Sequence, residues 1–253
     1  MSKGTILITG ASSGLGEEMA RQFADLGYDL GLCARRTDRL EALREEITAA
    51  HPERRVELKA LDVTDDDAVF SVFKELAADF AGLDRVIINA GLGKGAPLGT
   101  GRYDANRQTA MTNFVAALAQ SEAAMEIFRE QAASGRRGHL VMISSMSALR
   151  GMRKTLTTYA ATKAGVAALA EGLQNERVKG VDVSIVYPGY IRSEMNEQVA
   201  QKTRFMVDTT TGVKAMVEAI ERRKAKAYVP AWPWVPIGAA MKHLPLSVVR
   251  KLT

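Results

Sequence analysis

The chain has 253 residues, a formal net charge of +5 and a hydrophobic content of 47%. This length fits one α/β domain, and the composition excludes disordered and fibrous classes of protein. Cys33 is the single cysteine and the three histidines are far apart, so we expect neither a disulfide nor a metal site. The basic residues are scattered without a recognition module, so we expect no nucleic-acid partner. No signal-peptide-like region and no run of about 18 apolar residues is present, which predicts a cytoplasmic protein without a transmembrane segment.

Short apolar runs alternate with segments of helical length through most of the chain. The runs are nearly continuously apolar, as expected for strands that are covered on both faces. They are Thr5–Thr9, Asp29–Ala34, Val56–Leu61, Arg85–Asn89, His139–Ser144 and Val181–Tyr187. The predicted helices between them are Gly14–Leu26, Asp38–Ala50, Asp65–Phe80, Tyr103–Ala133 and Thr157–Lys179, with Asp65 or Thr64 as the N-cap of the third. This alternation predicts a doubly wound parallel sheet with helices on both faces.

The pattern loosens after the sixth predicted strand. Residues 190–208 have no clear period and are expected to form a loop, followed by a helix at Thr209–Lys226 and a short strand at Ala227–Pro230. Prolines divide the tail, residues 231–253, into short pieces, and this tail also carries Trp232 and Trp234. No break in composition marks a second domain, so residues 1–253 are expected to form one domain.

A glycine-rich turn joins the first predicted strand to the first helix. Its sequence is Thr9-Gly10-Ala11-Ser12-Ser13-Gly14-Leu15-Gly16. Glycines in this spacing permit a tight turn and a close approach of the backbone to a pyrophosphate. The helix that follows presents its free amides and positive dipole end to the phosphates. The turn therefore predicts a dinucleotide site made by Gly10, Ser12, Ser13, Gly14, Leu15 and Gly16.

Tyr159 and Lys163 lie four residues apart on a predicted helix, so their side chains share one face. A lysine ammonium beside a phenol favours the phenolate and is expected to lower the tyrosine pKa. A tyrosine of this kind can exchange a proton with a substrate oxygen near neutral pH. The pair is common on ordinary helix surfaces, so the remaining motifs must decide its meaning.

Those motifs occur together in one order. Gly10, Gly14 and Gly16 are followed by Asn89-Ala90-Gly91, then by Tyr159-x-x-x-Lys163, and finally by Pro188-Gly189. In this order and spacing the chain resembles the classical branch of the short-chain dehydrogenase/reductase family. The resemblance covers about four fifths of the chain. It implies a single-domain Rossmann fold and an oxidoreductase, such as a carbonyl reductase, that interconverts a ketone or aldehyde and an alcohol by hydride transfer.

The resemblance also implies the catalytic residues. Tyr159 would be the acid/base, Lys163 would lower its pKa and bind the nicotinamide ribose, and Asn113 would hold a water in a proton relay. The family places a serine at the end of the fifth strand, where it polarises the substrate carbonyl. Ser145 matches it best, with one extra residue in the loop that follows, and Ser147 remains the alternative.

The coenzyme choice depends on the end of the second strand. Enzymes that use NAD place an acidic residue there, whereas this chain has Arg35 and Arg36. Arginine suits a phosphate, so we predict NADP(H), and Asp38 is expected to serve as an N-cap. By resemblance, Asp62 and Val63 would line the adenine pocket. The remaining predicted coenzyme contacts are Asn89, Ala90, Gly91, Tyr159, Lys163, Pro188, Gly189, Ile191 and Ser193.

Several alternatives stay open at this stage. A non-catalytic NADP-sensing regulator and an epimerase or dehydratase of the same fold are the competing functions. The segment with Met195, Phe205, Met206 and Val207 predicts an apolar surface over a small-molecule carbonyl or alcohol substrate. By resemblance we expect a homo-dimer or homo-tetramer through the predicted helices Tyr103–Ala133 and Thr157–Lys179. The tail would cover a neighbouring subunit's active site, which we prefer, or contact a membrane surface.

Overall fold

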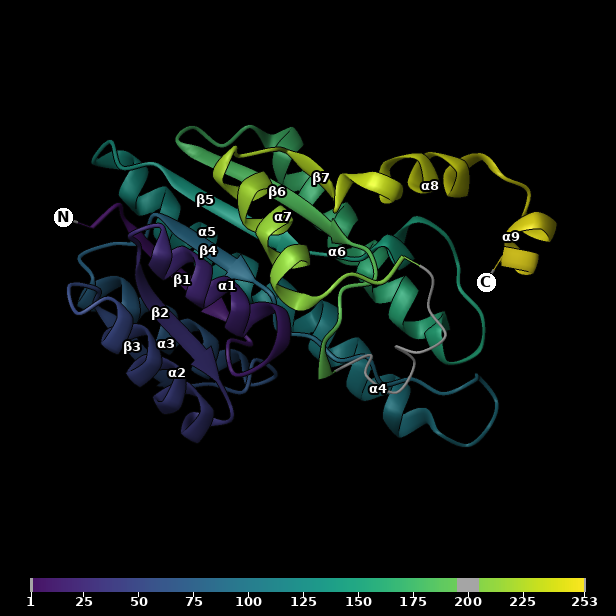
Figure 1. The fold of residues 1–253 in the computed structure, drawn as a ribbon, viewed down its shortest axis with the longest axis horizontal. Helices are drawn as coiled ribbons and strands as arrows, with labels where there is room; N and C mark the ends of the chain where they lie inside the picture. Colours follow the sequence, from purple (N-terminus) through teal and green to yellow (C-terminus); the bar gives the residue numbers. More distant parts are fainter. Residues whose placement is uncertain (1, 195–204, 253) are drawn as a thin grey trace.

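One parallel sheet organises the part of the chain that the computed structural model describes, residues 2–194 and 205–252. Its strands lie in the order β3-β2-β1-β4-β5-β6-β7 (Figure 1). They are β1 (Thr5–Thr9), β2 (Asp29–Ala34), β3 (Val56–Ala60), β4 (Arg85–Ile88), β5 (Gly138–Ile143), β6 (Val181–Pro188) and β7 (Lys226–Val229). The order reverses direction between β1 and β4, so the connecting helices cover both faces. The prediction of a single-domain, doubly wound Rossmann fold is confirmed.

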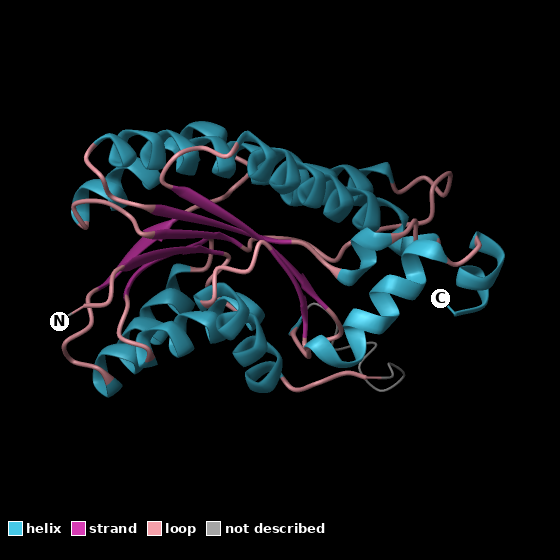
Figure 2. Cartoon of the chain, turned by 90° about the horizontal axis from the view of Figure 1, so that it is seen from above, coloured by secondary structure: helices cyan, strands magenta, loops and turns pink. Residues whose placement is uncertain are grey.

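Two helical layers enclose the sheet (Figure 2). The first consists of α1 (Gly14–Asp25), α2 (Thr37–Ala50) and α7 (Thr209–Glu221), and the second contains α3 (Asp66–Asp79), α5 (Ala116–Ala133) and α6 (Thr157–Glu176). Successive residues of β1 pack alternately against the two helical layers. Ile6 and Ile8 belong to the first core cluster and Leu7 to the second, and all three are fully buried. This two-sided burial explains why the strands read as continuous apolar runs.

The predicted helix Tyr103–Ala133 has the expected ends, but it is not α-helical throughout. The structure has α4 (Tyr103–Ala110), a π-helical turn at Met111–Val115 and then α5. In that turn the amide of Ala116 donates to the carbonyl of Met111, five residues back. Asn113 stands in the turn, and its side chain holds the backbone of Leu92 through two hydrogen bonds of 2.7 and 2.9 Å. Such single π-turns occur often at functional sites.

Helix N-termini follow the predictions only in part. Asp65 caps α3 as expected, because its carboxylate accepts from the Ala68 amide at 3.1 Å. The prediction that Asp38 caps the second helix is wrong. α2 begins at Thr37 after Arg36, which makes no side-chain cap. Asp38 instead lies in the first turn, where a carboxylate still favours the helix dipole.

The tail forms two short helices, α8 (Ala231–His243) and α9 (Leu246–Leu252), in agreement with the predicted division into short pieces. Trp232 has non-helical angles (φ −96°, ψ 131°), so the regular part of α8 starts at Pro233. A proline is tolerated at that first position because its missing N–H has no partner there to lose. Pro236 would clash with the carbonyl four residues back, but that carbonyl belongs to the non-helical Trp232. None of the helices described is long and apolar enough to cross a bilayer.

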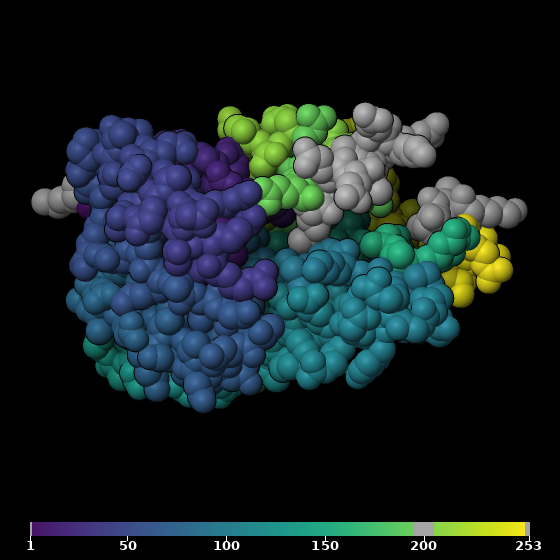
Figure 3. Space-filling view, turned by 90° about the horizontal axis from the view of Figure 1, so that it is seen from below, coloured from purple at the N-terminus to yellow at the C-terminus, as the bar shows by residue number. Residues whose placement is uncertain are grey.

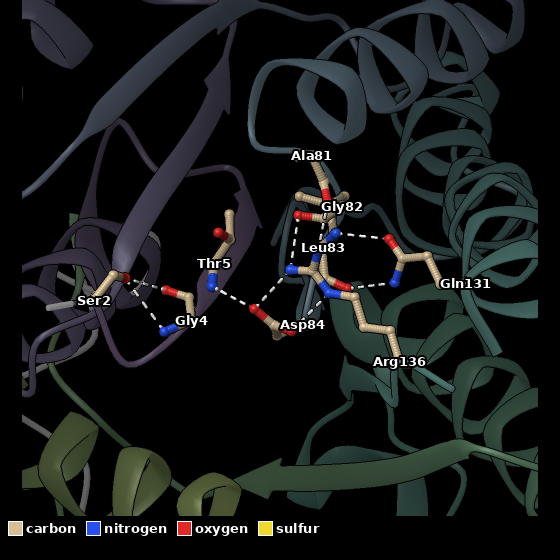
Figure 4. A network of polar contacts seen from close by, with 9 residues as sticks. All are labelled: Ser2, Gly4, Thr5, Ala81, Gly82, Leu83, Asp84, Gln131 and Arg136. Carbon is tan, nitrogen blue, oxygen red and sulfur yellow. Dashed lines mark hydrogen bonds and ion pairs between the residues drawn. The ribbon is translucent and has the colours of Figure 1, made fainter. Parts of the chain in front are cut away.

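A polar network joins the N-terminal ends of β1 and β4 (Figure 4). The Asp84 carboxylate accepts from the Thr5 amide at 2.8 Å and from two guanidinium nitrogens of Arg136, each at 2.9 Å. Gln131 exchanges two hydrogen bonds with the backbone of Leu83. These contacts fix the end of the sheet opposite the carboxyl ends of the strands. In folds of this kind ligands bind at the carboxyl ends.

Candidate active site

A cleft of about 1180 Å³ opens at the carboxyl ends of the strands. It lies where the strand order reverses, which is the usual ligand position in a doubly wound sheet. Its walls come from the β1–α1 turn, the ends of β2 to β6, α4 and the segment after β6. In Figure 3 the purple N-terminal part, the teal part that contains α4 and the green segment after β6 meet around this hollow.

The glycine-rich turn forms one end of the cleft. Gly10 (φ +68°) and Gly14 (φ +57°) adopt left-handed conformations that favour glycine. Both residues line the cleft, together with Ser12, Ser13 and Leu15. Gly16 is absent from the lining found among the described residues. A Cβ atom on Gly16 would lie 2.3 Å from the Gly10 carbonyl oxygen, so this glycine allows α1 to pack against the turn.

Asn89 ties the end of β4 to the glycine-rich turn. Its side-chain amide donates to the carbonyl oxygens of Thr9 at 3.0 Å and Gly10 at 3.3 Å. Its backbone amide donates to the Thr9 hydroxyl at 3.2 Å. Asn89 lines the cleft with Ala90 and Gly91. These bonds hold two adjacent strand ends in the register that shapes the floor of the cleft.

The arginines after β2 border the same end of the cleft. Arg36 donates to the hydroxyls of Ser12 at 3.2 Å and Ser13 at 2.6 Å. Arg35 is largely exposed and lies 3.9 Å from the carboxylate of Asp62. Asp62 and Val63 also line the cleft, as predicted for an adenine pocket. The Arg36 guanidinium therefore lies beside the N-terminus of α1, an arrangement that attracts anions.

Glu194 is a residue of this end that sequence reasoning missed. Its carboxylate lies 3.3 Å from the Arg36 guanidinium and 2.5 Å from that of Arg39. The bonds to Arg39 and Arg36 lower the pKa of Glu194 below its ordinary value. No local pattern marks Glu194, because its partners lie more than 150 residues earlier in the chain. It also lines the cleft.

Ser145, Tyr159 and Lys163 come together on the opposite wall. Ser145 follows β5, and its hydroxyl accepts from the backbone amide of Ser147 at 3.1 Å, while its interaction with Tyr159 lowers the pKa of that phenol. Ser147 does not appear in the described lining of the cleft. Ser144 also lines the cleft, but its hydroxyl donates to the Lys163 carbonyl at 2.8 Å. The geometry therefore favours Ser145 over Ser147 as the serine beside the tyrosine.

The prediction that Lys163 lowers the pKa of Tyr159 is wrong for this arrangement. Burial raises the pKa of the phenol above 10.0, and the hydrogen bond with Ser145 offsets only part of that rise. The Lys163 ammonium donates to the carbonyl oxygen of Ile143 at 2.9 Å. Burial lowers the pKa of Lys163 to about 8. Desolvation, which disfavours the charged form of both groups, is the dominant effect here.

Asn113 lies directly behind the cleft wall and not in the lining described for it. Beyond its two bonds to Leu92, its amide lies 3.3 Å from the Thr162 hydroxyl. A Cβ atom on Gly91 would be 3.3 Å from the Asn113 oxygen and 3.4 Å from the Lys163 nitrogen. The side chain of Asn113 therefore lies next to Gly91 and Lys163, and it is hydrogen-bonded to the backbone that forms the cleft wall.

The segment after β6 completes the cleft with Pro188, Gly189, Ile191 and Ser193. Ile191 forms a parallel bridge with Val207, which brings together the two ends of the predicted substrate-covering loop. Phe205 is 55% exposed at one end of it. Met195, the other apolar residue singled out there, lies outside the described residues, as do residues 196–204.

Other lining residues were not identified from the sequence. They come from four places, namely the turn after β3, the segment after Gly91, α4 and the π-helical turn that follows it. They are Thr64, Leu92, Gly93, Lys94, Asp104, Arg107, Gln108, Met111 and Thr112. Residues 92–94 could have been identified from the sequence, because they directly follow Asn89-Ala90-Gly91. The α4 residues could not have been identified from the sequence, because only the packing of α4 beside α6 turns them toward the cleft.

Comparisons with known proteins agree with this geometry. The family model described as short chain dehydrogenase matches residues 4–204. An uncharacterised oxidoreductase of Mycobacterium tuberculosis is 49% identical over 247 residues, which is 97% of this chain and 96% of that protein. A short-chain dehydrogenase from Sphingobium yanoikuyae in complex with NADPH has a TM-score of 0.81 and 27% identity, covering 98% and 94% of the two chains. A short-chain dehydrogenase/reductase from Burkholderia phymatum in complex with NAD shares the fold, with a TM-score of 0.83 at 20% identity over 99% and 95% of the chains.

Proposed function

The chain belongs to the short-chain dehydrogenase family, and on that basis we propose that it is an NADP(H)-dependent oxidoreductase that interconverts a ketone or aldehyde and an alcohol. The observation that carries this proposal is the wall on which Ser145, Tyr159 and Lys163 face one cleft, opposite a glycine-rich turn. A proton donor at one end and an anion-attracting turn at the other are what hydride transfer with a phosphorylated coenzyme needs.

The residues present fit a dinucleotide coenzyme. Gly10 and Gly14 leave the backbone of the turn open, and the N-terminus of α1 faces the cleft. Arg36 provides a guanidinium group beside Ser12 and Ser13, and Arg35 provides a second one at the cleft near Asp62, which favours a coenzyme with an extra 2′-phosphate. The similar structures hold NADPH in one case and NAD in the other. Our preference for NADP(H) therefore depends on these arginines.

The bound nicotinamide would supply or accept the hydride. Ser145 and Tyr159 would donate hydrogen bonds to the substrate oxygen, and Tyr159 would give it a proton in the reductive direction. The raised pKa of Tyr159 keeps the phenol protonated, as a proton donor must be. We assign Lys163 to the nicotinamide ribose, since its ammonium lies in the wall beside Gly91. Asn113 positions that wall through Leu92 and belongs to the proposed proton relay.

The other assignments follow from the same cleft. Asn89, Ala90, Gly91, Asp62 and Val63 would contact the adenosine and ribose parts of the coenzyme. The turn at Pro188, Gly189, Ile191 and Ser193 would contact the nicotinamide end. We propose a small-molecule carbonyl substrate with an apolar surface, since Phe205 and Val207 lie at the base of the covering loop. A cytoplasmic location and reduction as the working direction accompany the NADP(H) preference.

Two other functions in the same fold carry less support. A regulator that senses NADP without turnover does not require the wall of Ser145 and Tyr159. An epimerase or dehydratase of this fold is the second of them.

Turnover separates these functions. We expect the protein to oxidise NADPH in the presence of a ketone, and we expect Tyr159→Phe to slow this about 10²- to 10⁴-fold, the range for loss of a general acid. Binding of NADPH, followed by fluorescence, should be nearly unchanged in the variant. Tyr103→Phe is the matched control, since Tyr103 is 76% exposed at the start of α4. A Tyr159→Phe variant that retains the full rate on a good substrate would show that the proton-transfer assignment is wrong.

A further inference from the structure

α8 is apolar on both its buried and its exposed side. Inside, it buries Pro233, Trp234 and Gly238. Outside, Trp232 is 77% exposed and Val235 is 47% exposed. A helix at the surface of a globular protein normally carries polar residues on its outer side, and one that is apolar all round is usually covered. The outer side of α8 therefore predicts a partner that buries apolar side chains.

Exposed apolar side chains also occur in α9. There Leu246 is 56% exposed and Val248 is 38% exposed. The residues 150–156 lie beside α9, since Arg150 donates to the Leu244 carbonyl and Arg153 to that of Arg250. Figure 3 shows the yellow C-terminal residues next to this green segment. We call α8, α9 and residues 150–156 together the tail face.

The charge on the tail face has one sign. No Asp or Glu occurs after Glu221, and none occurs between Glu130 and Glu171, so neither part of the face has an acidic side chain. Exposed cations surround the apolar residues instead. They are Arg153, Lys154, Lys242 and Arg250. The partner that covers this face must therefore accept Trp232 and its apolar neighbours and carry negative charge at its surface.

A second copy of the chain fits this description poorly. In a two-fold symmetric contact the same patch meets itself, so the exposed cations of one copy would face those of the other. Like charges in such a contact oppose association. The surface of an anionic bilayer fits on both counts. Tryptophan favours the interface between lipid and water, and each nearby lysine or arginine is attracted to acidic headgroups.

We propose that the tail face is a docking surface for anionic phospholipid membranes. In the docked state Trp232, Val235, Leu246 and Val248 enter the headgroup region, while the cations contact the phosphates. The surface is rigidly connected to the cleft. Trp234 packs on Gly189, where a Cβ atom would lie 2.1 Å from the indole, and Gly238 packs against Leu149 and Met146. Docking would thus hold the turns after β5 and β6 close to the lipid surface, whatever the substrate is.

Flotation with lipid vesicles tests this proposal without any activity measurement. We expect the full-length protein to float with vesicles of phosphatidylcholine mixed with phosphatidylglycerol, and not with phosphatidylcholine alone. The double variant Trp232→Ser, Val235→Ser should lower the floated fraction at least about fivefold. The double variant Lys242→Gln, Arg250→Gln should lower it similarly, and added salt should mimic this second variant because it screens exposed charges.

Matched variants elsewhere on the surface serve as controls. Leu26→Ser removes an apolar side chain that is 42% exposed at the end of α1, and Lys214→Gln removes an exposed cation from α7. Both should float as the unmodified protein does. Equal flotation with both kinds of vesicle, or with neither, would overturn the proposal. So would a loss of oligomer size on gel filtration of Trp232→Ser, Val235→Ser without any change in flotation, since the face would then be a contact between copies.

Discussion

Single charged side chains carry the coenzyme preference that we propose. Arg36 is fixed by the hydroxyls of Ser12 and Ser13, so its guanidinium is held beside the N-terminus of α1. Arg35 is more exposed and faces only Asp62. Glu194 lies against Arg36 and Arg39 on the other side. A surface ion pair of this kind contributes little by itself, so a phosphate group with several donors can compete with it.

Arg36→Ala should therefore weaken NADPH binding selectively. Loss of hydrogen bonds to a charged group costs about 1.5–3 kcal/mol, which corresponds to roughly a 10- to 100-fold higher Kd. The Kd for NADH should change little. Arg44→Ala, which removes another exposed arginine of α2, is the control. Titration of the coenzyme by fluorescence measures both constants, and an equal loss for NADPH and NADH would contradict the assignment.

His139 is a residue whose charge affects stability away from the cleft. It is fully buried at the start of β5, where Arg85 donates to its Nδ1 at 3.0 Å and its Nε2 lies 2.8 Å from the Ser184 hydroxyl. Because Nδ1 accepts a hydrogen bond, the proton of the neutral ring is on Nε2, which donates to Ser184. Burial, together with the neighbouring Arg85, lowers the pKa of His139 from 6.5 to about 3.

The free energy of unfolding should accordingly decrease as the pH is lowered through a defined range. Between pH 6.5 and 3 the unfolded chain binds a proton at His139 and the folded protein does not, so stability decreases as pH falls. The full effect is roughly 5 kcal/mol, from about 1.4 kcal/mol per pKa unit. His139→Asn keeps an acceptor for Arg85 and should flatten this part of the profile. Urea unfolding at several pH values measures it, and identical slopes for both proteins would contradict the prediction.

At the scale of elements, close packing of helices on strand ends shapes the cleft. Gly16 lets α1 approach the Gly10 carbonyl, and Gly189 lets α8 place Trp234 against the turn after β6. The π-helical turn between α4 and α5 places Asn113 where it holds Leu92. In each case a contact between elements, and not a feature of one helix alone, sets the position of a cleft wall.

The variants Gly16→Ala and Gly172→Ala compare a closely packed helical glycine with one that has open space around it. A methyl group on Gly16 would lie 2.3 Å from the Gly10 oxygen and 2.6 Å from the Asn89 amide, so α1 must shift. We expect destabilisation by about 1–3 kcal/mol, together with weaker coenzyme binding. Gly172 in α6 has nothing within 4 Å of the same position. Its replacement should stabilise by about 0.5–1 kcal/mol. Thermal unfolding compares them, and equal effects would refute the packing explanation.

At the scale of the whole molecule, several of the exposed apolar side chains lie on two helical surfaces. One is the tail face, and the other lies on the π-helical turn and α5, where Phe114 is 36% and Leu118 is 45% exposed. Phe114 also packs against Gly165, where a Cβ atom would lie 2.8 Å away, so α5 and α6 form one broad helical surface. This surface is the contact that we propose for a homo-dimer or homo-tetramer.

Leu118→Glu should therefore reduce the size of the oligomer. The charged side chain would have to lose its water in a contact between two copies, which is unfavourable without a partner. Leu26→Glu is the control, because Leu26 is exposed to a similar degree at the end of α1. Light scattering coupled to gel filtration gives the masses. An unchanged mass for Leu118→Glu would place the contact elsewhere, and a monomeric unmodified protein would refute the oligomer itself.

The sequence by itself determined the fold class and most of the lining of the cleft. Apolar runs, helical periods and the glycine spacing are local signals, and they are sufficient because each strand and turn is built from neighbouring residues. Gly10, Tyr159 and Pro188 thus fell on their expected elements. Strand and helix ends shifted by one or a few residues, because capping depends on side-chain contacts that periodicity does not show.

The tertiary structure alone decided how the site residues are charged and held. Tyr159 has a raised pKa, contrary to the prediction from its spacing to Lys163, because desolvation depends on what covers the pair. Glu194 contacts Arg36, which lies 158 positions earlier in the sequence, and Trp234 of α8 packs on Gly189 in the turn after β6. Local sequence determines where a side chain lies on its own element, but only the packing of distant elements determines which charges and surfaces it meets.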